Sequence, residues 1–208
     1  MQSILQGIEA IKEGNKRSSS GDSKFLKLTD GESATIRFLQ ELDSSGTNYS
    51  EDRGLAVGIY EHINPKDFSQ SFLCTKEATG KCLGCEKQPI DKKWRPRGRL
   101  LVNVLLRGGR GEDNKVKILA TSITNKGLTP QLVEFAEEYK TLCDRDYKMK
   151  RTGEGFDTVY TLMPRDIAPL KKEEELMELV RFDTVYKDLN HDQQLELLDS
   201  SSNSEKDW

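Results

Sequence analysis

The cysteine-rich stretch at residues 62–85 reads HINPKDFSQSFLCTKEATGKCLGC. It holds three of the four cysteines and one of the two histidines in the 208-residue chain. Structural zinc sites take four tetrahedral nitrogen and sulfur ligands, and a Cys3His set is common among them. The short step from Cys82 to Cys85 lets two thiolates from one turn reach the same ion. The spacing therefore predicts one structural zinc ion, held by His62, Cys74, Cys82 and Cys85.

The fourth ligand is the least certain member of this set, because the carboxylates of Glu77 and Glu86 lie nearby in the sequence. A CxxC pair alone is also typical of a redox site, and three buried thiols with a surface histidine are the plainest alternative. Glycines flank Cys82 at positions 80 and 84 and are expected to relieve backbone strain. Cys143 is interpreted as an ordinary small apolar residue. Four protein ligands make a closed site, which favours a structural over a catalytic metal.

Charge is distributed unevenly along the chain, although its net value is only −3. Residues 171–208 contain 5 basic and 11 acidic residues, whereas residues 81–110 contain 9 basic and 2 acidic residues. This asymmetry indicates a basic patch joined to an acidic tail. The chain contains no run of 18 apolar residues and no secretory signal, so we expect a cytoplasmic protein without a membrane partner.

The densest basic segment, residues 92–99, reads KKWRPRGR. Proteins that bind single strands combine a positive track for phosphates with aromatic rings on which bases stack. We therefore expect phosphate contacts and one stacked base at this segment. The contacts are predicted for Lys92, Lys93, Trp94, Arg95, Arg97 and Arg99, extended by Arg107, Arg110, Lys115 and Lys117. Solvated loop charges are the plain alternative.

Other aromatic and basic residues are weaker candidates for the same surface. Tyr60, Phe72, Tyr147 and Tyr160 are possible stacking residues, for which packing in the core is at least as good an explanation. Lys148, Lys150 and Arg151 form a second basic cluster.

Hydrophobic periodicity predicts several short strands and one internal helix, which favours a small barrel or sandwich. Strands are expected at residues 25–28, 34–39, 55–63, 100–106, 115–123 and 156–162. Helices are expected at residues 1–14, 129–142 (with Thr129 as its cap) and 171–181. Residues 62–94 are expected to be irregular, and the chain beyond Asp188 to be largely disordered.

Several stretches together resemble a known family. They are FLKLTDGESATIRFL (25–39), VGIYEH (57–62), FSQSFLC (68–74), KCLGC (81–85) and KKWRPRGRLLVNVLL (92–106). In order and spacing the chain resembles the zinc-containing single-stranded DNA-binding proteins of T-even-like tailed phages, over roughly residues 25–165. It departs from them in a closer spacing of Cys74 and Cys82, and its basic stretch at residues 92–99 has one tryptophan where the family tends to have several aromatic residues.

The resemblance implies a mainly β protein with some α structure: an OB-fold, five-stranded barrel at residues 21–170 with a zinc subdomain inserted at residues 62–90. Residues 1–20 would be an N-terminal helix and linker that supports self-association along DNA, with Lys16-Arg17-Ser18-Ser19 as the nearest match to the family's arm motif. Residues 171–208 would be an acidic helix and flexible tail that recruits replication and recombination proteins. The implied function is coating of single-stranded DNA during phage DNA replication, recombination and repair.

Two other classes compete with this interpretation. A zinc-containing RNA-binding protein, or one that regulates transcription or translation, fits the same residues, because base stacking does not distinguish RNA from DNA. A zinc hydrolase or nuclease fits poorly, since the sequence offers no paired carboxylates beside a metal, no nucleophile elbow and no phosphate-binding glycine loop. We therefore expect a protein without enzymatic activity.

Overall fold

A computed structural model describes residues 23–108, 113–186 and 188–202 of the chain. These residues fall into two compact units. The described part of the sheet unit consists of residues 23–58, 99–108 and 113–180, and that of the cysteine unit consists of residues 59–98, 181–186 and 188–202. The predicted helix at 1–14, the arm at 1–20, Arg110 and the chain end at 203–208 lie outside the described residues.

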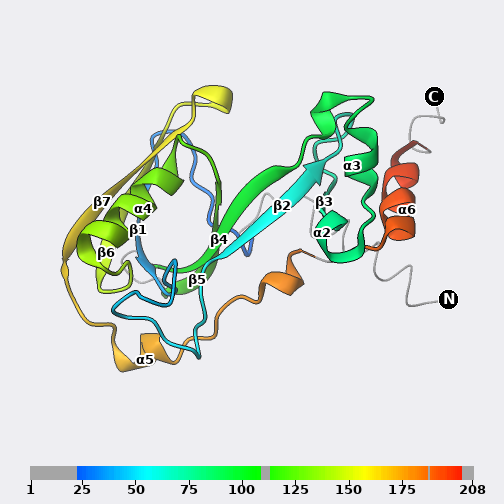
Figure 1. The fold of residues 1–208 in the computed structure, drawn as a ribbon. Coiled ribbons are helices and arrows are strands. Elements are labelled where there is room, and N and C mark those ends of the chain that lie inside the picture. The colour runs from blue at the N-terminus through cyan, green and yellow to red at the C-terminus, as the bar shows by residue number, and fades with distance from the viewer. Residues whose placement is uncertain (1–22, 109–112, 187, 203–208) are drawn as a thin grey trace. The chain divides into compact units, whose positions relative to one another are not determined.

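The protein is mainly β, as predicted. In the described residues seven strands form one antiparallel sheet in the order β3-β2-β4-β1-β6-β7, with β5 paired to β4 (Figure 1). The strands are β1 (Ser33–Phe38), β2 (Val57–Ile63), β3 (Ser71–Leu73), β4 (Arg97–Leu106), β5 (Lys115–Ser122), β6 (Arg145–Thr152) and β7 (Val159–Ile167). Helix α4 (Leu128–Tyr139) connects β5 to β6, and the short elements η2 (Gly155–Asp157) and α5 (Lys172–Glu175) complete the sheet unit.

Alternation of apolar residues explains why the strands of the sheet unit share one core. Every second residue points inward, so that Ile36 with Phe38 on β1, and Val102 with Val104 on β4, are fully buried. Helix α4 covers this core with Leu128, Leu132 and other apolar residues. None of the helices in the described residues is long and apolar enough to cross a membrane.

Strand β6 was not predicted, because its sequence RDYKMKRT is dominated by charge. Its inward residues, Tyr147 and Met149, are buried in the core, while Lys148 and Lys150, which alternate with them, are exposed. Tertiary packing of two large apolar side chains therefore outweighs the polar composition of the strand. Tyr147 is fully buried and presents no ring face for a stacked base.

Three further expectations for the sheet unit differ from the structure. The segment expected as a strand at residues 25–28 forms only an isolated bridge from Phe25 to Ile118. Helix α4 begins at Leu128 after Gly127, and the Thr129 hydroxyl donates to the carbonyl of Ser122 instead of capping the helix. The helix expected at residues 171–181 is limited to the four residues of α5.

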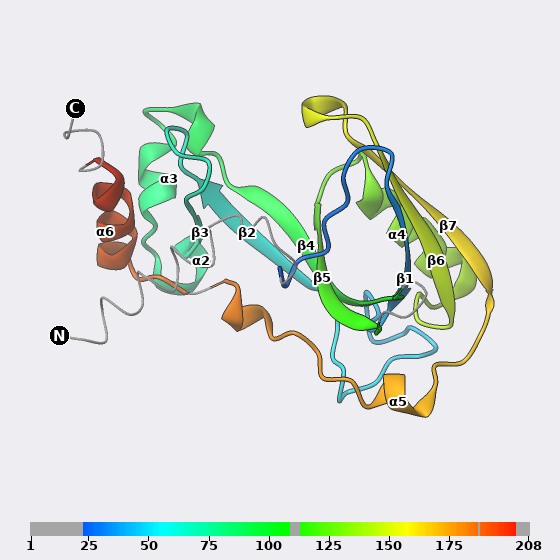
Figure 2. The ribbon, with the colours of Figure 1, turned by 180° about the vertical axis from the view of Figure 1, so that it is seen from behind.

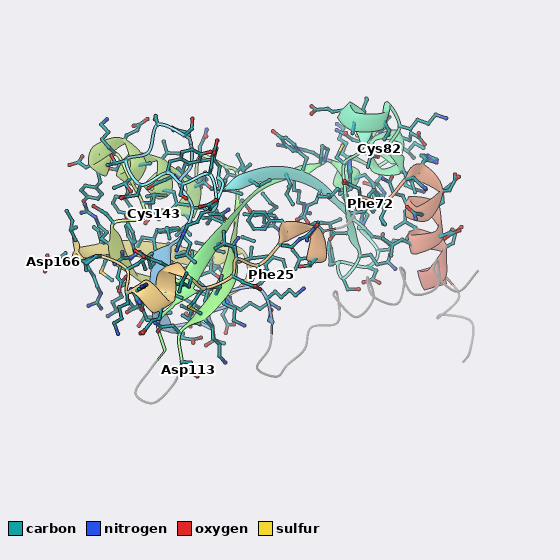
Figure 3. All side chains as sticks on the ribbon, turned by 90° about the horizontal axis from the view of Figure 1, so that it is seen from below. Phe25, Phe72, Cys82, Asp113, Cys143 and Asp166 are labelled. Atoms are coloured by element: carbon teal, nitrogen blue, oxygen red, sulfur yellow. The ribbon has the colours of Figure 1, made fainter. Side chains whose placement is uncertain are left out.

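The cysteine unit has its own regular elements where residues 62–94 were expected to be irregular. They are most of β2, then β3, α2 (Lys76–Thr79), α3 (Leu83–Lys87), η1 (Lys92–Trp94), η3 (Phe182–Thr184) and α6 (His191–Ser202). A second core joins Phe72, Cys82 and Trp94 to the C-terminal Leu189 and Leu197. Figure 3 shows Phe72 and Cys82 among the side chains of this unit.

The expectation of disorder beyond Asp188 is therefore wrong for helix α6. Asn190 and Gln193 form a reciprocal cap at its start: the Gln193 backbone N–H donates to Asn190 Oδ1, and the Asn190 N–H donates to Gln193 Oε1, both at 3.0 Å. Such a capping box satisfies backbone donors that the helix itself leaves free. Burial of Leu197 on the inner side then holds the helix against the second core.

An ion-pair network within the sheet unit joins strands β1 and β6 to helix α5. Arg37, 1% exposed, donates from Nε to Asp146 at 2.8 Å, and Arg107 Nε donates to the other oxygen of Asp146 at 3.0 Å. Arg107 also pairs with the buried carboxylate of Glu174. Burial alone would raise the pKa of Asp146, but the hydrogen bond from Arg107 and the charges of both arginines outweigh it and lower that pKa below the ordinary 3.8.

We predict that Asp146→Asn lowers the free energy of unfolding by about 2–3 kcal/mol at neutral pH, because the buried Arg37 and the partly buried Arg107 lose their shared anion. Because the folded-state pKa of Asp146 is lowered, its contribution is present above the ordinary value of 3.8 and is lost as pH falls through the lower folded value. Urea unfolding at pH 7 and at acid pH measures both. A variant as stable as the wild type at pH 7 would contradict the prediction; Asp166→Asn, at an exposed site, is the control.

Candidate metal centre and basic surface

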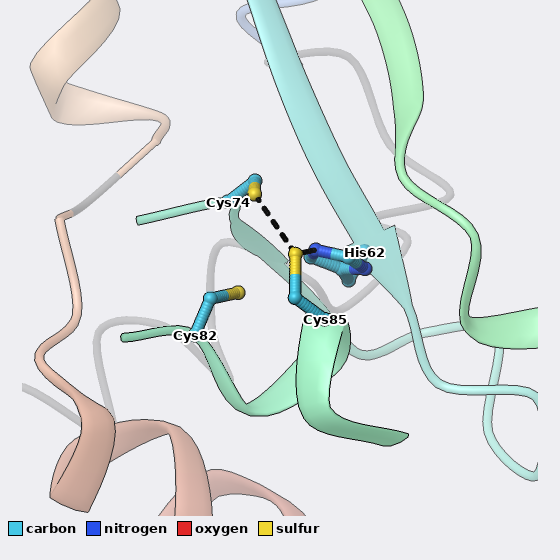
Figure 4. Close-up of side chains that lie close together, drawn as sticks. All are labelled: His62, Cys74, Cys82 and Cys85. Carbon is cyan, nitrogen blue, oxygen red and sulfur yellow. Dashed lines mark hydrogen bonds between the residues drawn. The ribbon is translucent and has the colours of Figure 1, made fainter. Parts of the chain in front are cut away.

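The four predicted ligands meet in the cysteine unit. His62 comes from β2, Cys74 directly follows β3, Cys82 precedes α3 and Cys85 lies within it. Their donor atoms all lie within 4.8 Å of one another. Figure 4 shows the four side chains pointing toward a common centre. The chain thus forms a group that can hold a metal ion, and it contains His62, not Glu77 or Glu86.

The separations of the donor atoms suit a tetrahedral ion. Cys74 Sγ lies 3.5 Å from Cys85 Sγ, and Cys85 Sγ lies 3.5 Å from His62 Nε2. Tetrahedral ligands at zinc–ligand distances of about 2.0–2.3 Å are themselves separated by about 3.5–3.8 Å. The cysteines of the cluster are free and not joined by disulfides. These two separations are compatible with ligands around one ion, and all four donor atoms lie within 4.8 Å of one another.

Local structure explains how these residues reach each other. Strands β2 and β3 pair so that His62 lies opposite Phe72, and the Cys74 backbone N–H donates to the carbonyl of Tyr60 at 2.8 Å. This hairpin presents His62 and Cys74 together, while the first turn of α3 presents Cys82 and Cys85. One chain reversal and one helical turn therefore supply all four ligands.

The two glycines of the loop have different roles. Gly80 has a φ of 75°, the left-handed conformation that favours glycine, and this agrees with the expected relief of strain. Gly84 is helical, and its role is steric: a Cβ there would lie 2.2 Å from His62 Cγ. The absence of a side chain at Gly84 is what lets the imidazole pack against α3.

The orientation of His62 is fixed by one hydrogen bond. The ring is fully buried, and Nδ1 lies 2.6 Å from the carbonyl oxygen of Trp94. A carbonyl can only accept, so Nδ1 carries the proton and Nε2 keeps its lone pair on the side of Cys85. Burial lowers the pKa of His62, although the bond to Trp94 opposes this effect. The neutral ring is the form that binds a metal, and such backbone partners orient metal-bound histidines.

Crowding of the thiols makes a cation favourable at the centre. Burial would raise the pKa of Cys82, but backbone amides of Cys85, Thr75 and Gly84 outweigh it and lower that pKa. Burial, the hydrogen bond with Cys74 and the charge of Cys82 raise the pKa of Cys85 to about 12. Ionisation of Cys85 is therefore disfavoured beside the other sulfurs, whereas a bound cation at the centre would stabilise its thiolate.

Cys143 does not belong to this centre. It lies in the sheet unit, where it packs against the apolar core as predicted, and burial raises the pKa of its thiol. Glu86 is engaged elsewhere, since its carboxylate lies 2.9 Å from Nε2 of His191.

Trp94 does not have the exposure expected of a stacking residue. It is 8% exposed, packs against Phe72 with ring centroids 6.3 Å apart, and lies beneath the ammonium of Lys87. Phe72 is buried in the same core. The Trp94 indole fills a small core that has few other large side chains, and it is therefore buried instead of exposed to solvent. Neither the Trp94 ring nor the Phe72 ring offers a free face to a base.

Burial of Trp94 nevertheless orders the cations around it. Lys92, Lys93, Arg95 and Arg97 are all exposed, whereas Trp94 between them points into the core. The Asp91 carboxylate accepts a hydrogen bond from the Lys93 backbone N–H and caps η1. We name these four cations the basic segment.

The remaining predicted contacts fall on the sheet unit. Lys115 is exposed, Arg99 donates to the Ser122 hydroxyl, Lys117 donates to the carbonyl of Ser23, and Arg107 is bound in the network with Asp146 and Glu174. In the second cluster Lys148 and Lys150 are exposed, whereas Arg151 donates to the carbonyl of Leu28. Arg107 therefore has its charge compensated within the unit and is a poor phosphate contact.

Tyr60 is the candidate aromatic that remains available. It is 56% exposed on β2, two residues before His62, whereas Tyr160 is half-buried. Sequence reasoning ranked it below Trp94, because a tryptophan inside a basic run is the stronger stacking pattern. Alternation along β2 gives no such signal, since it places Tyr60 on the same face as the buried His62, yet Tyr60 is exposed.

No protein-family model, curated protein or solved structure matches this chain.

Proposed function

We propose that the protein holds one structural zinc ion in the His62 and cysteine cluster and binds single-stranded DNA through the adjoining basic segment, without catalysing a reaction. The observation that carries the proposal is the hydrogen bond from His62 to the Trp94 carbonyl. It connects a metal ligand directly to the residue that anchors the four exposed cations. Metal binding would thus fix the segment that contacts the phosphates.

Zinc is the ion that this donor set favours. Three thiolates and one imidazole are soft ligands in a tetrahedral arrangement, and four protein ligands leave no open position for substrate. The metal's role would be to stabilise a unit whose apolar core is small. Elemental analysis of the purified protein is expected to find one zinc per chain; a different stoichiometry, or zinc-dependent strand cleavage in a nuclease assay, would reject this proposal.

The strand order of the sheet unit supports an OB-type fold. Strand β1 pairs with β4 and β6, β4 pairs with β5, and β6 pairs with β7, with α4 between β5 and β6. These are the neighbours expected of a five-stranded Greek-key barrel, with the segment from β1 to β4 as its first loop. OB-folds bind oligonucleotides with the second and third strands and with the first and last loops. The cysteine cluster and the basic segment both belong to that first loop.

One part of the usual OB surface is closed in this chain. Asn103 on β4 is 1% exposed, and its side-chain amide exchanges two hydrogen bonds with the backbone of Val180, at 2.9 and 3.2 Å. Leu101 and Leu105, which point to the same side of β4, are also buried. For this reason we assign the nucleic acid to the basic segment and Tyr60 and not to the middle of β4.

The family resemblance of the sequence supports a proposal for the biological setting. We propose coating of single strands in a phage-infected cell's cytoplasm during replication, recombination and repair, with the acidic C-terminus as the site for protein partners. Binding of labelled oligo-dT, followed by fluorescence anisotropy with poly-U as competitor, tests the nucleic-acid assignment. Poly-dT serves as the second competitor. Stronger competition by poly-U than by poly-dT would favour the RNA-binding alternative, and a protein that binds neither polymer would reject the proposal.

We predict that Tyr60→Ala weakens oligo-dT binding by about 5–150-fold, because one stacked base contributes about 1–3 kcal/mol. Phe68→Ala is the matched control, since Phe68 is another exposed aromatic of the same unit and lies in the β2–β3 turn. Anisotropy titrations of both variants measure the effect. Equal affinities for the two variants would remove Tyr60 from the binding surface.

A further inference from the structure

Helix α6 packs against the elements that hold the cluster. In both ribbon views it runs beside α3 (Figures 1 and 2), and the two helices are in contact. Leu189 and Leu197 are buried together with Cys82 and Leu83. The Gln70 side chain donates to the carbonyl of Leu197 at 3.2 Å. The C-terminal end of the described chain thus packs against the core of the cysteine unit and forms part of it.

One residue of α6 reaches the ligand-bearing segments directly. Gln194 is 0% exposed, and its Oε1 accepts a hydrogen bond from the backbone N–H of Leu83 at 2.9 Å. Its Nε2 donates to Thr75 Oγ1 at 3.1 Å and to the Leu189 carbonyl at 2.9 Å. Leu83 follows Cys82, and Thr75 follows Cys74. A single amide therefore spans the backbone beside two of the four ligands.

The same contacts extend to the approach to Cys82. Thr75 Oγ1 donates to the carbonyl of Lys81 at 2.7 Å, so the segments on either side of the α2 turn are held together. Gln194 uses both amide hydrogens and its oxygen in these contacts. A buried amide is tolerated only where its hydrogen bonds are made, so its position is tightly specified by the loop.

Helix α6 depends on this docking in turn. It has 12 residues, and isolated helices of this length are marginal in water. Its outward residues Asp192, Glu196 and Asp199 are exposed and acidic, so only the inner side adds apolar burial. The order of α6 is therefore set by the surface that the ligand loop presents to it.

We infer that Gln194 is a positioning residue for the metal centre, so that zinc binding and docking of α6 stabilise each other. The inference rests on the zinc site proposed above. By linkage, the factor by which docked α6 strengthens zinc binding equals the factor by which zinc strengthens docking. Loss of the metal would release an acidic helix from the cysteine unit.

The test is the zinc affinity of the full chain with Gln194→Met, which keeps the side-chain length and removes the hydrogen bonds. Partners in the outer shell of a metal site change affinity by about 10–100-fold, and we expect a loss in that range by competition with a chromophoric chelator. Glu196→Gln, on the exposed side of the same helix, is the control and should bind zinc as the wild type does. An unchanged affinity in Gln194→Met would overturn the inference.

Hydrogen exchange of the unaltered protein provides the second measurement, independent of whether the variant folds. Backbone amides of α6 should exchange about 10–100-fold faster after zinc is removed by a chelator, by the same linkage. Equal protection of α6 with and without zinc would overturn the coupling while leaving the zinc site in place. A wild-type chain that takes up no zinc would overturn both proposals.

Discussion

Gly84→Ala is expected to weaken zinc binding at least about a hundredfold, although position 84 provides no ligand. The new Cβ would lie 2.2 Å from Cγ and 2.5 Å from Nδ1 of His62. The imidazole is enclosed and fixed by Trp94, so either the ring or α3 must shift by more than a side chain can absorb. The site then loses its nitrogen ligand or separates Cys85 from the other thiolates. Structural zinc contributes about 10–16 kcal/mol over four ligands, so one ligand is worth several kcal/mol.

Gly80→Ala is the matched control for this prediction. Gly80 lies in the same loop, but no atom lies within 4 Å of the position of its Cβ. The Gly80→Ala substitution is expected to destabilise the folded protein by about 1–2 kcal/mol, because alanine is strained in the left-handed conformation. This effect does not involve a metal ligand. Competition with a chelator compares the two variants. If Gly84→Ala bound zinc no more weakly than Gly80→Ala, the packing of His62 against α3 would not be required for the site.

The ligand set was predictable from sequence, because zinc imposes chemistry that spacing reveals. Cys74, Cys82 and Cys85 are the three cysteines within a short span, and His62 is the histidine nearest to them. The structure brings these four together. What spacing could not show was the packing around them, such as the steric role of Gly84.

Burial was harder to infer where a residue type serves two purposes. A tryptophan among cations is typical of a stacking platform, yet Trp94 is a core residue, because the cysteine unit has few other large apolar groups to bury. Strand β6 could not be predicted for a different reason: its exposed lysines alternate with the buried Tyr147 and Met149, so its overall composition is polar. In both cases long-range packing decides, and a local pattern does not record it.

The sequence of helix α6 contains a local pattern that is typical of a helix. Asn190 followed by Gln193 is a helix-start pattern, and Leu189 with Leu197 supply an apolar side. Acidic composition suggested a flexible tail, because composition averages over the buried positions. The polar Gln194 gave no hint of burial, since two of its partners, the Leu83 backbone N–H and the Thr75 hydroxyl, lie more than 100 residues earlier in the chain.

Neutralising the basic segment should produce the largest change in DNA binding. Replacing Lys92, Lys93, Arg95 and Arg97 together by glutamine removes four exposed cations and leaves the buried Trp94 anchor in place. Each phosphate contact to a single strand contributes about 0.7 to the slope of log affinity against log salt. The slope should therefore fall by about 3, and affinity at low salt by about a thousandfold.

A variant with an equal number of removed charges elsewhere separates local contact from general attraction. Lys66, Lys76, Lys81 and Lys126 are exposed and lie outside the basic segment, and their joint replacement by glutamine removes the same charge. If long-range attraction alone held the DNA, both quadruple variants would lose slope equally, because net charge is then what matters. A loss confined to the first variant requires phosphates to lie along residues 92–97. Zinc content measured in both preparations ensures that the difference is not a failure of the metal centre.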